Sequence, residues 1–296
     1  MNTAEMTAKV AQGRGFIAAL DQSGGSTPKA LRGYGIEDSE WSSEEEMFAA
    51  IHEMRSRVIL SPCFSSGKVI GAILFERTMD SDVAGKPTAD ALKERGIVPF
   101  IKVDEGLAEE ADGVQLMKPL RKLPALLEKS VAKGMFGTKM RSVIKSANAS
   151  GIAAIVAQQF EVGAQISDAG LMPILEPEYD ITAEDRAEGE AMLREEIMQG
   201  LDALPEGRQV MLKLSIPAEP RFYTPLIEHP RVLRVVALSG GYSTEEACSH
   251  LSRNPGMIAS FSRGLLQDLR KAQSDVEFDR TLGEAIERIE HASVAG

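Results

Sequence analysis

Short apolar runs recur about eight times along the chain, and longer helical stretches separate them. We expect strands at Phe16–Leu20, Ala72–Phe75, Pro99–Val103, Lys139–Ile144, Met172–Leu175, Gln209–Leu214, Arg234–Leu238 and Met257–Phe261. Strands that alternate with helices imply a parallel sheet, and eight of them are what a closed (β/α)8 barrel requires. The pattern predicts an α/β protein with one TIM-barrel domain over residues 1–296. A two-domain doubly wound fold is the alternative.

The stretches between these runs have the periodicity of amphipathic helices. We expect helices over Ile152–Ala169 and Ala183–Ala203. The segment Val276–His291 places apolar residues at helical spacing, so it should pack as a last helix. These apolar residues are Phe278, Leu282, Ile286 and Ile289.

The formal net charge of −11 argues against a nucleic-acid partner or an anionic membrane, which would need a basic face. It does not exclude an anionic small molecule, because a few lysines can make a local positive pocket. No apolar run approaches the roughly 18 residues of a membrane span, and the N-terminus lacks the apolar core of a signal peptide. Cys63 and Cys248 fit no motif. We therefore expect a reducing, cytoplasmic setting.

Polar residues fall where the predicted strands end. The carboxyl ends of barrel strands gather at one mouth, where active sites of this fold lie. A single polar ending would mean little, but a set containing lysines and acids predicts a site at this mouth. The residues are Asp21, Glu76, Lys102, Glu176, Lys213, Ser239 and Ser262.

Lys213 lies in an otherwise apolar strand. Because side chains alternate along a strand, Val210, Leu212 and Leu214 should face the helices, whereas Met211 and Lys213 should face the barrel interior. Desolvation disfavours the ammonium form and leaves free amine to attack a carbonyl. The alternative is a lysine that extends back to solvent.

Two further strands carry paired charges on one face. Lys102 and Asp104 could form a structural ion pair, or Lys102 could bind a phosphate. Lys139 and Arg141 would repel each other on a buried strand unless an anion lies between them, and a solvated strand end is the alternative.

Glu176 and Glu178 flank Pro177, which we expect to end its strand. A carboxylate near several lysines can act as a general acid and base. The alternative is a pair of exposed acids in a turn.

Three loops of small residues follow predicted strands and could offer backbone N–H groups and hydroxyls to a phosphate. The loops after strands seven and eight are the usual phosphate site of this barrel, although each alone could be a simple turn. The loops contain Ser23 and Ser26, then Ser239, Gly240 and Gly241, and finally Ser262 and Arg263. The first loop lacks the Gly-Lys-Ser/Thr ending of a Walker loop.

The four histidines are scattered and show no metal-ligand spacing. A zinc or iron site is therefore not expected, although acids alone could hold a divalent ion. We predict no metal and no cofactor.

The chain resembles the class I, or Schiff-base, fructose-bisphosphate aldolases. The matching segments occur in the family's order between residues of about 16 and 270, and they are FIAALDQSGGS, AILFE, FIKVDEG, TKMRSVIK, MPILEPE, VMLKLS, LSGGYSTEEA and IASFSRG. The resemblance implies a barrel that reversibly cleaves fructose 1,6-bisphosphate to dihydroxyacetone phosphate and glyceraldehyde 3-phosphate in glycolysis and gluconeogenesis.

The resemblance also implies roles. Lys213 matches the Schiff-base lysine, Glu176 the proton shuttle and Glu178 the second acid of the same motif. Asp21 matches an aspartate that orients the Schiff-base lysine and a substrate hydroxyl. Lys139 matches a lysine that assists at the substrate C4 hydroxyl.

Phosphate contacts follow in the same way. Lys102, Ser23 and Ser26 match the 6-phosphate site, and Ser239, Gly240 and Gly241 match the 1-phosphate loop. Arg141 lies beside Lys139, and Ser262 and Arg263 complete the predicted substrate site.

Some positions depart from the animal branch of the family. Leu265 stands where that branch has an arginine, so Arg263 is expected to replace it with a small shift. Ala30 replaces a basic residue and leaves Lys29 as the nearby cation, and the terminal tyrosine is absent. These departures suggest a bacterial-type branch.

Two alternatives remain at this point. One is a class I aldolase for a related sugar phosphate, such as tagatose 1,6-bisphosphate or fructose 1-phosphate. The other is a non-catalytic barrel that binds a sugar phosphate. The partner is in each case a small-molecule sugar phosphate, and the sequence leaves a homo-oligomer open.

Overall fold

Eight parallel strands close into a barrel in the computed structural model, which describes residues 1–295. Each strand pairs with the next in the order β1-β2-β5-β7-β8-β9-β10-β11, and β1 meets β11 where Ala19 N donates to Phe261 O at 3.5 Å. The strands are β1 (Phe16–Leu20), β2 (Val69–Leu74), β5 (Val98–Lys102), β7 (Gly137–Ile144), β8 (Met172–Tyr179), β9 (Val210–Ser215), β10 (Val232–Leu238) and β11 (Met257–Ala259). The predicted TIM-barrel fold is confirmed.

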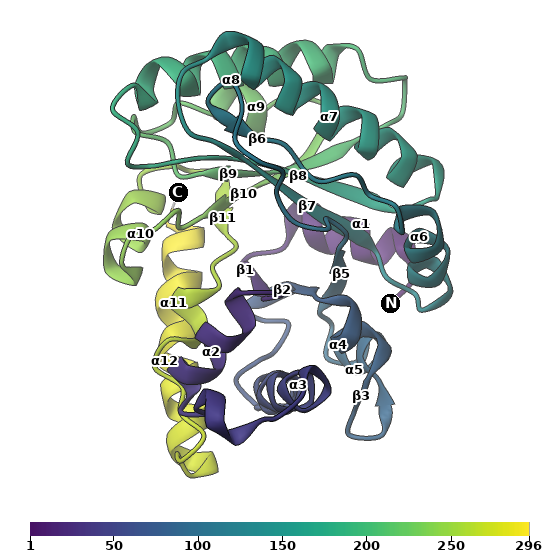
Figure 1. Cartoon of the computed structure of the whole chain (residues 1–296), viewed down its shortest axis with the longest axis vertical. Helices are drawn as coiled ribbons and strands as arrows, with labels where there is room; N and C mark the ends of the chain where they lie inside the picture. Colours follow the sequence, from purple (N-terminus) through teal and green to yellow (C-terminus); the bar gives the residue numbers. More distant parts are fainter. Residues whose placement is uncertain (296) are drawn as a thin grey trace.

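Helices surround the barrel, as the ribbon in Figure 1 shows. They are α1 (Thr3–Gln12), α2 (Ser26–Tyr34), α3 (Glu44–Leu60), α4 (Glu76–Asp80), α5 (Thr88–Glu94), α6 (Leu123–Ala132), α7 (Ala149–Asp168), α8 (Arg186–Asp202), α9 (Thr224–Ile227), α10 (Thr244–Leu251), α11 (Arg263–Leu266) and α12 (Asp275–Val294). A 3-10 turn, η1, covers Asp38–Glu40, and the short strands β3 (Asp82–Val83), β4 (Lys86–Pro87) and β6 (Val114–Gln115) lie outside the parallel barrel.

Strand β8 is longer than expected, because it continues through Pro177 to Tyr179. The expectation that Pro177 ends the strand is wrong. Pro177 pairs in register with Ser142 of β7, whereas the pairing of β8 with β9 stops at Leu175. Proline is tolerated in a strand where its missing N–H faces a side without a neighbouring ladder. Glu176 and Glu178 therefore project from a strand and not from a turn.

Two apolar layers result from the alternation of side chains along the strands. Val210, Leu212 and Leu214 belong to the layer between strands and helices, and Met211 belongs to the barrel interior, as predicted. The interior layer also contains Ile17, Ile73, Phe100, Ile174, Val236 and Ile258.

Helix α1 covers one end of the barrel. Its Met6 and Val10 belong to the interior cluster, and Arg234 near the start of β10 donates to Ala11 O at 2.7 Å. The amino-terminal ends of the strands are thereby closed, so the opposite mouth is the one that can admit a ligand.

Helix α12 confirms the predicted last helix. Phe278, Leu282, Ile286 and Ile289 are all at most 1% exposed. The helix, yellow in Figure 1, packs against α11 and α10, and its Ser293 Oγ accepts a hydrogen bond from Ala259 N in β11. The carboxyl-terminal helix thus anchors the last barrel strand.

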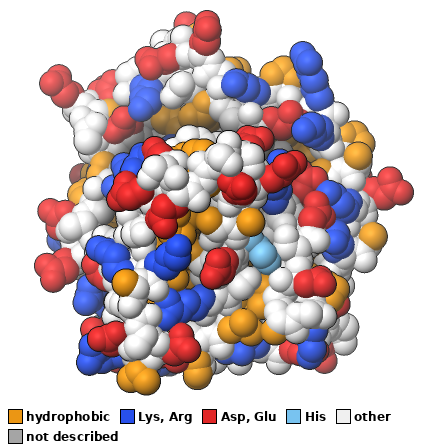
Figure 2. All heavy atoms as spheres, turned by 60° about the horizontal axis from the view of Figure 1, so that its bottom comes forward, with side chains coloured by type: hydrophobic (Ala, Val, Ile, Leu, Met, Phe, Trp, Pro, Cys, Tyr) orange, Lys and Arg blue, Asp and Glu red, His pale blue; other side chains and the backbone are white. Residues whose placement is uncertain are grey.

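On the face shown in Figure 2, acidic and basic side chains are interspersed and apolar ones are scattered between them. No helix within residues 1–295 combines the length and the apolar character needed to cross a membrane.

Phe100 packs at the centre of the barrel interior, fully buried and edge-on to Phe136 at 5.4 Å between ring centroids. Phe100→Ala should lower the free energy of unfolding by about 3–5 kcal/mol, because it leaves a cavity that the closed barrel cannot fill. Chemical denaturation measures this loss. The control is Val276→Ala at a 79% exposed position, which should change it by less than about 0.5 kcal/mol. Equal losses would contradict this description of the core.

Candidate active site

A cavity of about 870 Å³ opens at the carboxyl ends of the strands. All of the residues expected at the mouth except Glu76 line it, together with the other predicted substrate contacts, so residues spread over more than 240 positions meet in one place. They are Asp21, Ser23, Ser26, Lys102, Lys139, Arg141, Glu176, Glu178, Lys213, Ser239, Gly240, Gly241, Ser262 and Arg263. Their individual roles stay predictions.

Four charged side chains form an ion-paired chain at the floor of the cavity. Lys139 Nζ lies 2.7 Å from Asp21 Oδ2 and 3.0 Å from Glu176 Oε2. Glu176 Oε1 in turn lies 3.0 Å from Lys213 Nζ. Glu176 therefore bridges the two lysines, and its carboxylate is within reach of a proton on Lys213.

Burial makes this pairing necessary. The side chains of Lys139, Glu176 and Lys213 are each 4–5% exposed, and that of Asp21 is 11% exposed. Charges removed from water must be paired, because an unpaired buried charge costs several kcal/mol. Lys102 and Asp104 extend the chain with a 2.7 Å ion pair, so three lysines face three carboxylates.

Burial tends to raise the pKa of Asp21, but the charges of Lys139, Lys213 and Lys102 outweigh it and hold the pKa well below its ordinary value. For Lys139, burial tends to lower the pKa, yet Asp21, Glu176 and Asp104 outweigh burial and raise it far above the usual range. Asp21 and Lys139 are therefore fixed charges at neutral pH. They are suited to orienting and stabilising other groups and poorly suited to exchanging protons.

A second pair lies further along the same strands. Arg141 Nε donates to Glu178 Oε2 at 2.6 Å. Lys139 and Arg141 thus each have carboxylate partners of their own, which offset their repulsion without an added anion. Glu178 is engaged by Arg141, which separates it from the pair formed by Glu176 and Lys213.

The loop after β10 has the backbone geometry of an anion site. Gly240 and Gly241 have φ of +61° and +124°, a region that favours glycine. A Cβ on Gly240 would come within 2.7 Å of Ile181. Within residues 1–295, the N–H groups of both glycines donate to no backbone carbonyl outside regular structure. They are available to a ligand.

The side-chain hydroxyl of Ser26 holds the loop after β1 in place. Ser26 Oγ donates to Ser23 O at 2.7 Å and accepts from Ser23 N at 2.9 Å. This ring fixes the turn that begins α2. Across the mouth, Ser262 and Arg263 begin α11 and line the same cavity.

The class I fructose-bisphosphate aldolase model, described as glycolytic, matches residues 2–213. The chain belongs to this family. The match extends to Lys213, the last residue of the ion-paired chain described above.

Solved structures show the same barrel. A ternary complex of Plasmodium falciparum fructose-bisphosphate aldolase with TRAP and a small-molecule inhibitor is 20% identical, covers 99% of this chain and 94% of its own, and has a TM-score of 0.72. A structural-genomics target from Corynebacterium glutamicum is 14% identical, covers 98% and 92%, and has a TM-score of 0.51. At these identities the likeness establishes the fold.

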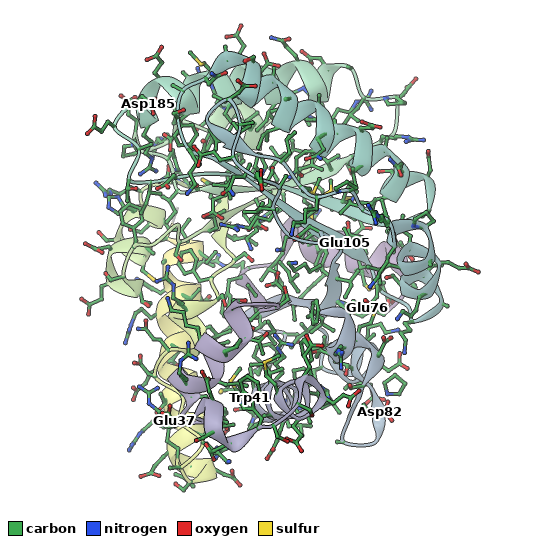
Figure 3. All side chains as sticks on the ribbon, viewed as in Figure 1. Glu37, Trp41, Glu76, Asp82, Glu105 and Asp185 are labelled. Carbon is green, nitrogen blue, oxygen red and sulfur yellow. The ribbon has the colours of Figure 1, made fainter. Side chains whose placement is uncertain are left out.

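Glu76 does not join the site, although it was expected at the mouth. It begins α4 and pairs with Lys129 Nζ at 2.6 Å, beside that helix in Figure 3. Strand β2 stops at Leu74, so Glu76 already belongs to the helix and does not line the cavity.

Sequence analysis missed Gln22, which lies in the cavity wall next to Asp21. It also missed Arg55, which contacts Gln22 from α3. Gln22 could have been found from its place in the first loop. Arg55 lies inside an amphipathic helix, where no motif marks it.

The low pKa of Asp21 makes the ion-paired chain sensitive to acid. A depressed folded-state pKa stabilises the fold fully above the unfolded value of 3.8, and this contribution is lost as the pH falls below it. In Asp21→Asn, unfolding free energy should therefore fall less steeply below pH 3.8 than in wild type, by up to about 1.4 kcal/mol per pH unit. Denaturation curves measured at several pH values give these slopes.

Glu206→Gln, at an exposed turn, is the matched control and should keep the wild-type slope. Identical slopes for wild type and Asp21→Asn would show that Asp21 does not have a lowered pKa.

Proposed function

We propose that the protein cleaves fructose 1,6-bisphosphate reversibly to dihydroxyacetone phosphate and glyceraldehyde 3-phosphate through a Schiff base on Lys213. One observation carries the proposal: the Lys213 amine is buried at the mouth of an aldolase-family barrel, 3.0 Å from the bridging carboxylate of Glu176. A lysine that forms a Schiff base needs both a desolvated amine and an adjacent proton acceptor.

The first step is proton transfer from the Lys213 ammonium to Glu176. The free amine then attacks the C2 carbonyl, and the protonated Glu176 returns the proton to the carbinolamine hydroxyl, which leaves as water. The product is an iminium ion, whose positive charge withdraws electrons from the C3–C4 bond. Lys139 keeps the other carboxylate oxygen of Glu176 oriented at 3.0 Å.

Cleavage needs a base for the C4 hydroxyl proton. Glu176 and Asp21 are both near, but the lowered pKa of Asp21 makes it a weak base. Glu176 Oε2 forms no well-aligned hydrogen bond within residues 1–295, so a lone pair remains for a substrate hydroxyl. We assign the base to Glu176 and the orienting role to Asp21. The enamine left after cleavage is protonated and hydrolysed to release dihydroxyacetone phosphate.

Two phosphate contacts would hold the ketose across the mouth. Lys102 uses two of its three N–H donors on Asp104, at 2.7 Å to Oδ1 and 3.1 Å to the carbonyl, which leaves one for the 6-phosphate. The free N–H groups of Gly240 and Gly241 suit the 1-phosphate. Fixing both ends orients C2 against Lys213, and orientation can supply several kcal/mol of barrier lowering.

The same proposal extends to the setting of the enzyme. We place the reaction in glycolysis and gluconeogenesis in the cytoplasm, without metal or cofactor, and the chain in a bacterial-type branch. The departures at Ala30 and Leu265 support the branch.

A non-catalytic barrel that binds a sugar phosphate is the competing class of function. Such a protein needs phosphate contacts but has no use for the proton-transfer pair of Glu176 and Lys213. Maintaining two buried lysines against shared carboxylates costs desolvation energy, which favours an enzyme.

Lys213→Met should lower aldol cleavage by on the order of 10³-fold or more, because no other amine takes its place. A coupled assay with fructose 1,6-bisphosphate in excess EDTA measures this loss, and wild-type activity should persist under the same conditions. The control is Lys118→Met, an exposed lysine outside the cavity, which should retain activity. Activity in Lys213→Met, or its abolition by EDTA in wild type, is incompatible with the mechanism.

Substrate choice tests the assignment of Lys102. Lys102→Met should lower kcat/KM about tenfold or more for fructose 1,6-bisphosphate but much less for fructose 1-phosphate, which has no 6-phosphate to lose. Tagatose 1,6-bisphosphate, the C4 epimer, should be cleaved more slowly than fructose 1,6-bisphosphate. Equal effects on both fructose phosphates would overturn the assignment of Lys102 to the 6-phosphate, and a preference for the tagatose compound would favour the related-aldolase alternative.

A further inference from the structure

Arg55 of α3 is a fully buried charge that the proposed mechanism does not use. Its guanidinium donates to Thr78 Oγ1 at 2.7 Å, to Gln22 O at 2.6 Å and to Gln22 Oε1 at 3.1 Å. Within residues 1–295 it forms no ion pair with a carboxylate, and its Nε has no partner. Burial lowers the pKa of Arg55 to about 10, only partly opposed by Asp21, so the group remains charged at neutral pH. Such a cation demands an explanation, because desolvation without a counter-ion is costly.

Arg55 determines which way the Gln22 amide points. Arginine only donates hydrogen bonds, so the oxygen of the Gln22 side chain must face it. The amide nitrogen is thereby turned to the opposite side, where it donates to Ala19 O at 3.2 Å and to Ser262 Oγ. The orientation of Gln22 is thus dictated by chemistry.

Gln22 in turn donates a hydrogen bond to the Ser262 hydroxyl, which leaves the hydroxyl proton free to be donated elsewhere. A serine hydroxyl has one proton to donate, and here its oxygen accepts from Gln22 Nε2. Within residues 1–295, Ser262 Oγ donates to no protein atom. Ser262 lines the cavity beside Arg263, at the loop that follows the last strand. Its proton is left for an acceptor inside the cavity.

We propose that Arg55 and Gln22 are positioning residues that hold Ser262 as a hydrogen-bond donor to a phosphate oxygen of the substrate. The proposal rests on the function proposed above. A phosphate dianion accepts hydrogen bonds from every side and suits the Ser262 hydroxyl, whose proton has no acceptor within residues 1–295. The chain of contacts thereby links α3 to the phosphate site.

Gln22→Glu tests the proposal with almost no change of shape. One carboxylate oxygen would pair with Arg55, while the other would face Ser262 and accept the hydrogen bond that its hydroxyl donates. The affinity for dihydroxyacetone phosphate should therefore fall about tenfold or more, the size expected for one lost hydrogen bond to a charged group. Titration calorimetry measures this affinity. The melting temperature should stay the same or rise, because Arg55 gains a counter-ion, so a loss of affinity would not reflect misfolding.

The added negative charge also repels phosphate, and a double-mutant cycle with Ser262→Ala separates the two effects. Charge repulsion by Glu at position 22 lowers the affinity equally with and without Ser262→Ala. Turning the Ser262 hydroxyl away from the phosphate lowers the affinity only when Ser262 is present. The loss caused by Gln22→Glu should be several-fold larger with Ser262 than with Ser262→Ala. Equal losses in the two backgrounds, or no loss at all, would overturn the proposal. The cycle needs no Arg55 variant, which could fail to fold.

A parallel experiment on wild type separates this proposal from the function on which it rests. Borohydride is added to wild-type protein with dihydroxyacetone phosphate, and the intact mass is recorded. If an adduct forms but the cycle shows equal losses, only the positioning role of Arg55 and Gln22 is wrong. If no adduct forms while the ligand binds, the Schiff-base function is wrong.

Discussion

Glu176 lies between two buried lysines, and the arrangement at the barrel mouth depends on this bridge. With Lys139 on one oxygen and Lys213 on the other, a single carboxylate balances charges contributed by β7 and β9. Asp21, which directly follows β1, compensates the remaining charge on Lys139. Removing any one member would leave an uncompensated charge out of water, a change that typically destabilises a protein by about 3–5 kcal/mol.

The pairing register of the strands brings Glu176 and the two lysines together. Glu176 on β8 is the register partner of Arg141 on β7, two residues beyond Lys139, and Lys139 is the partner of Lys102 on β5. A slip of one residue would turn Lys139 into the helical layer and bring Met140 to the interior. The same alternation that buries Met211 inside the barrel therefore aims Lys213 at its carboxylate. Packing and chemistry follow from one backbone pattern.

The barrel strands and the side chains that face the interior could be predicted from the sequence, because both depend on local periodicity. Eight apolar runs located all eight barrel strands, and alternation correctly assigned Met211 to the interior. Other features depend on contacts between distant segments. Pro177 could stay in its strand only because β9 leaves that edge unpaired. Glu76 was misplaced because the end of β2 and the start of α4 set its direction.

The carboxylate partner of each cation could not be predicted from the sequence either. The charges on β7 suggested that Lys139 and Arg141 need an anion between them. Only the folded structure shows that Lys139 pairs with Glu176 and Arg141 with Glu178. Arg55 carries no motif, and its link to the phosphate site passes through a hydrogen-bond orientation that no sequence pattern encodes.

The central claim is that the amine of Lys213, and no other lysine of the cavity, becomes covalently bound to the substrate carbon. Peptide mapping by mass spectrometry after borohydride reduction in the presence of isotopically labelled dihydroxyacetone phosphate tests it most directly. We expect the label on the peptide that contains Lys213, with none on peptides containing Lys102 or Lys139. Label on either of those lysines, or on no peptide while the ligand is bound, would contradict it.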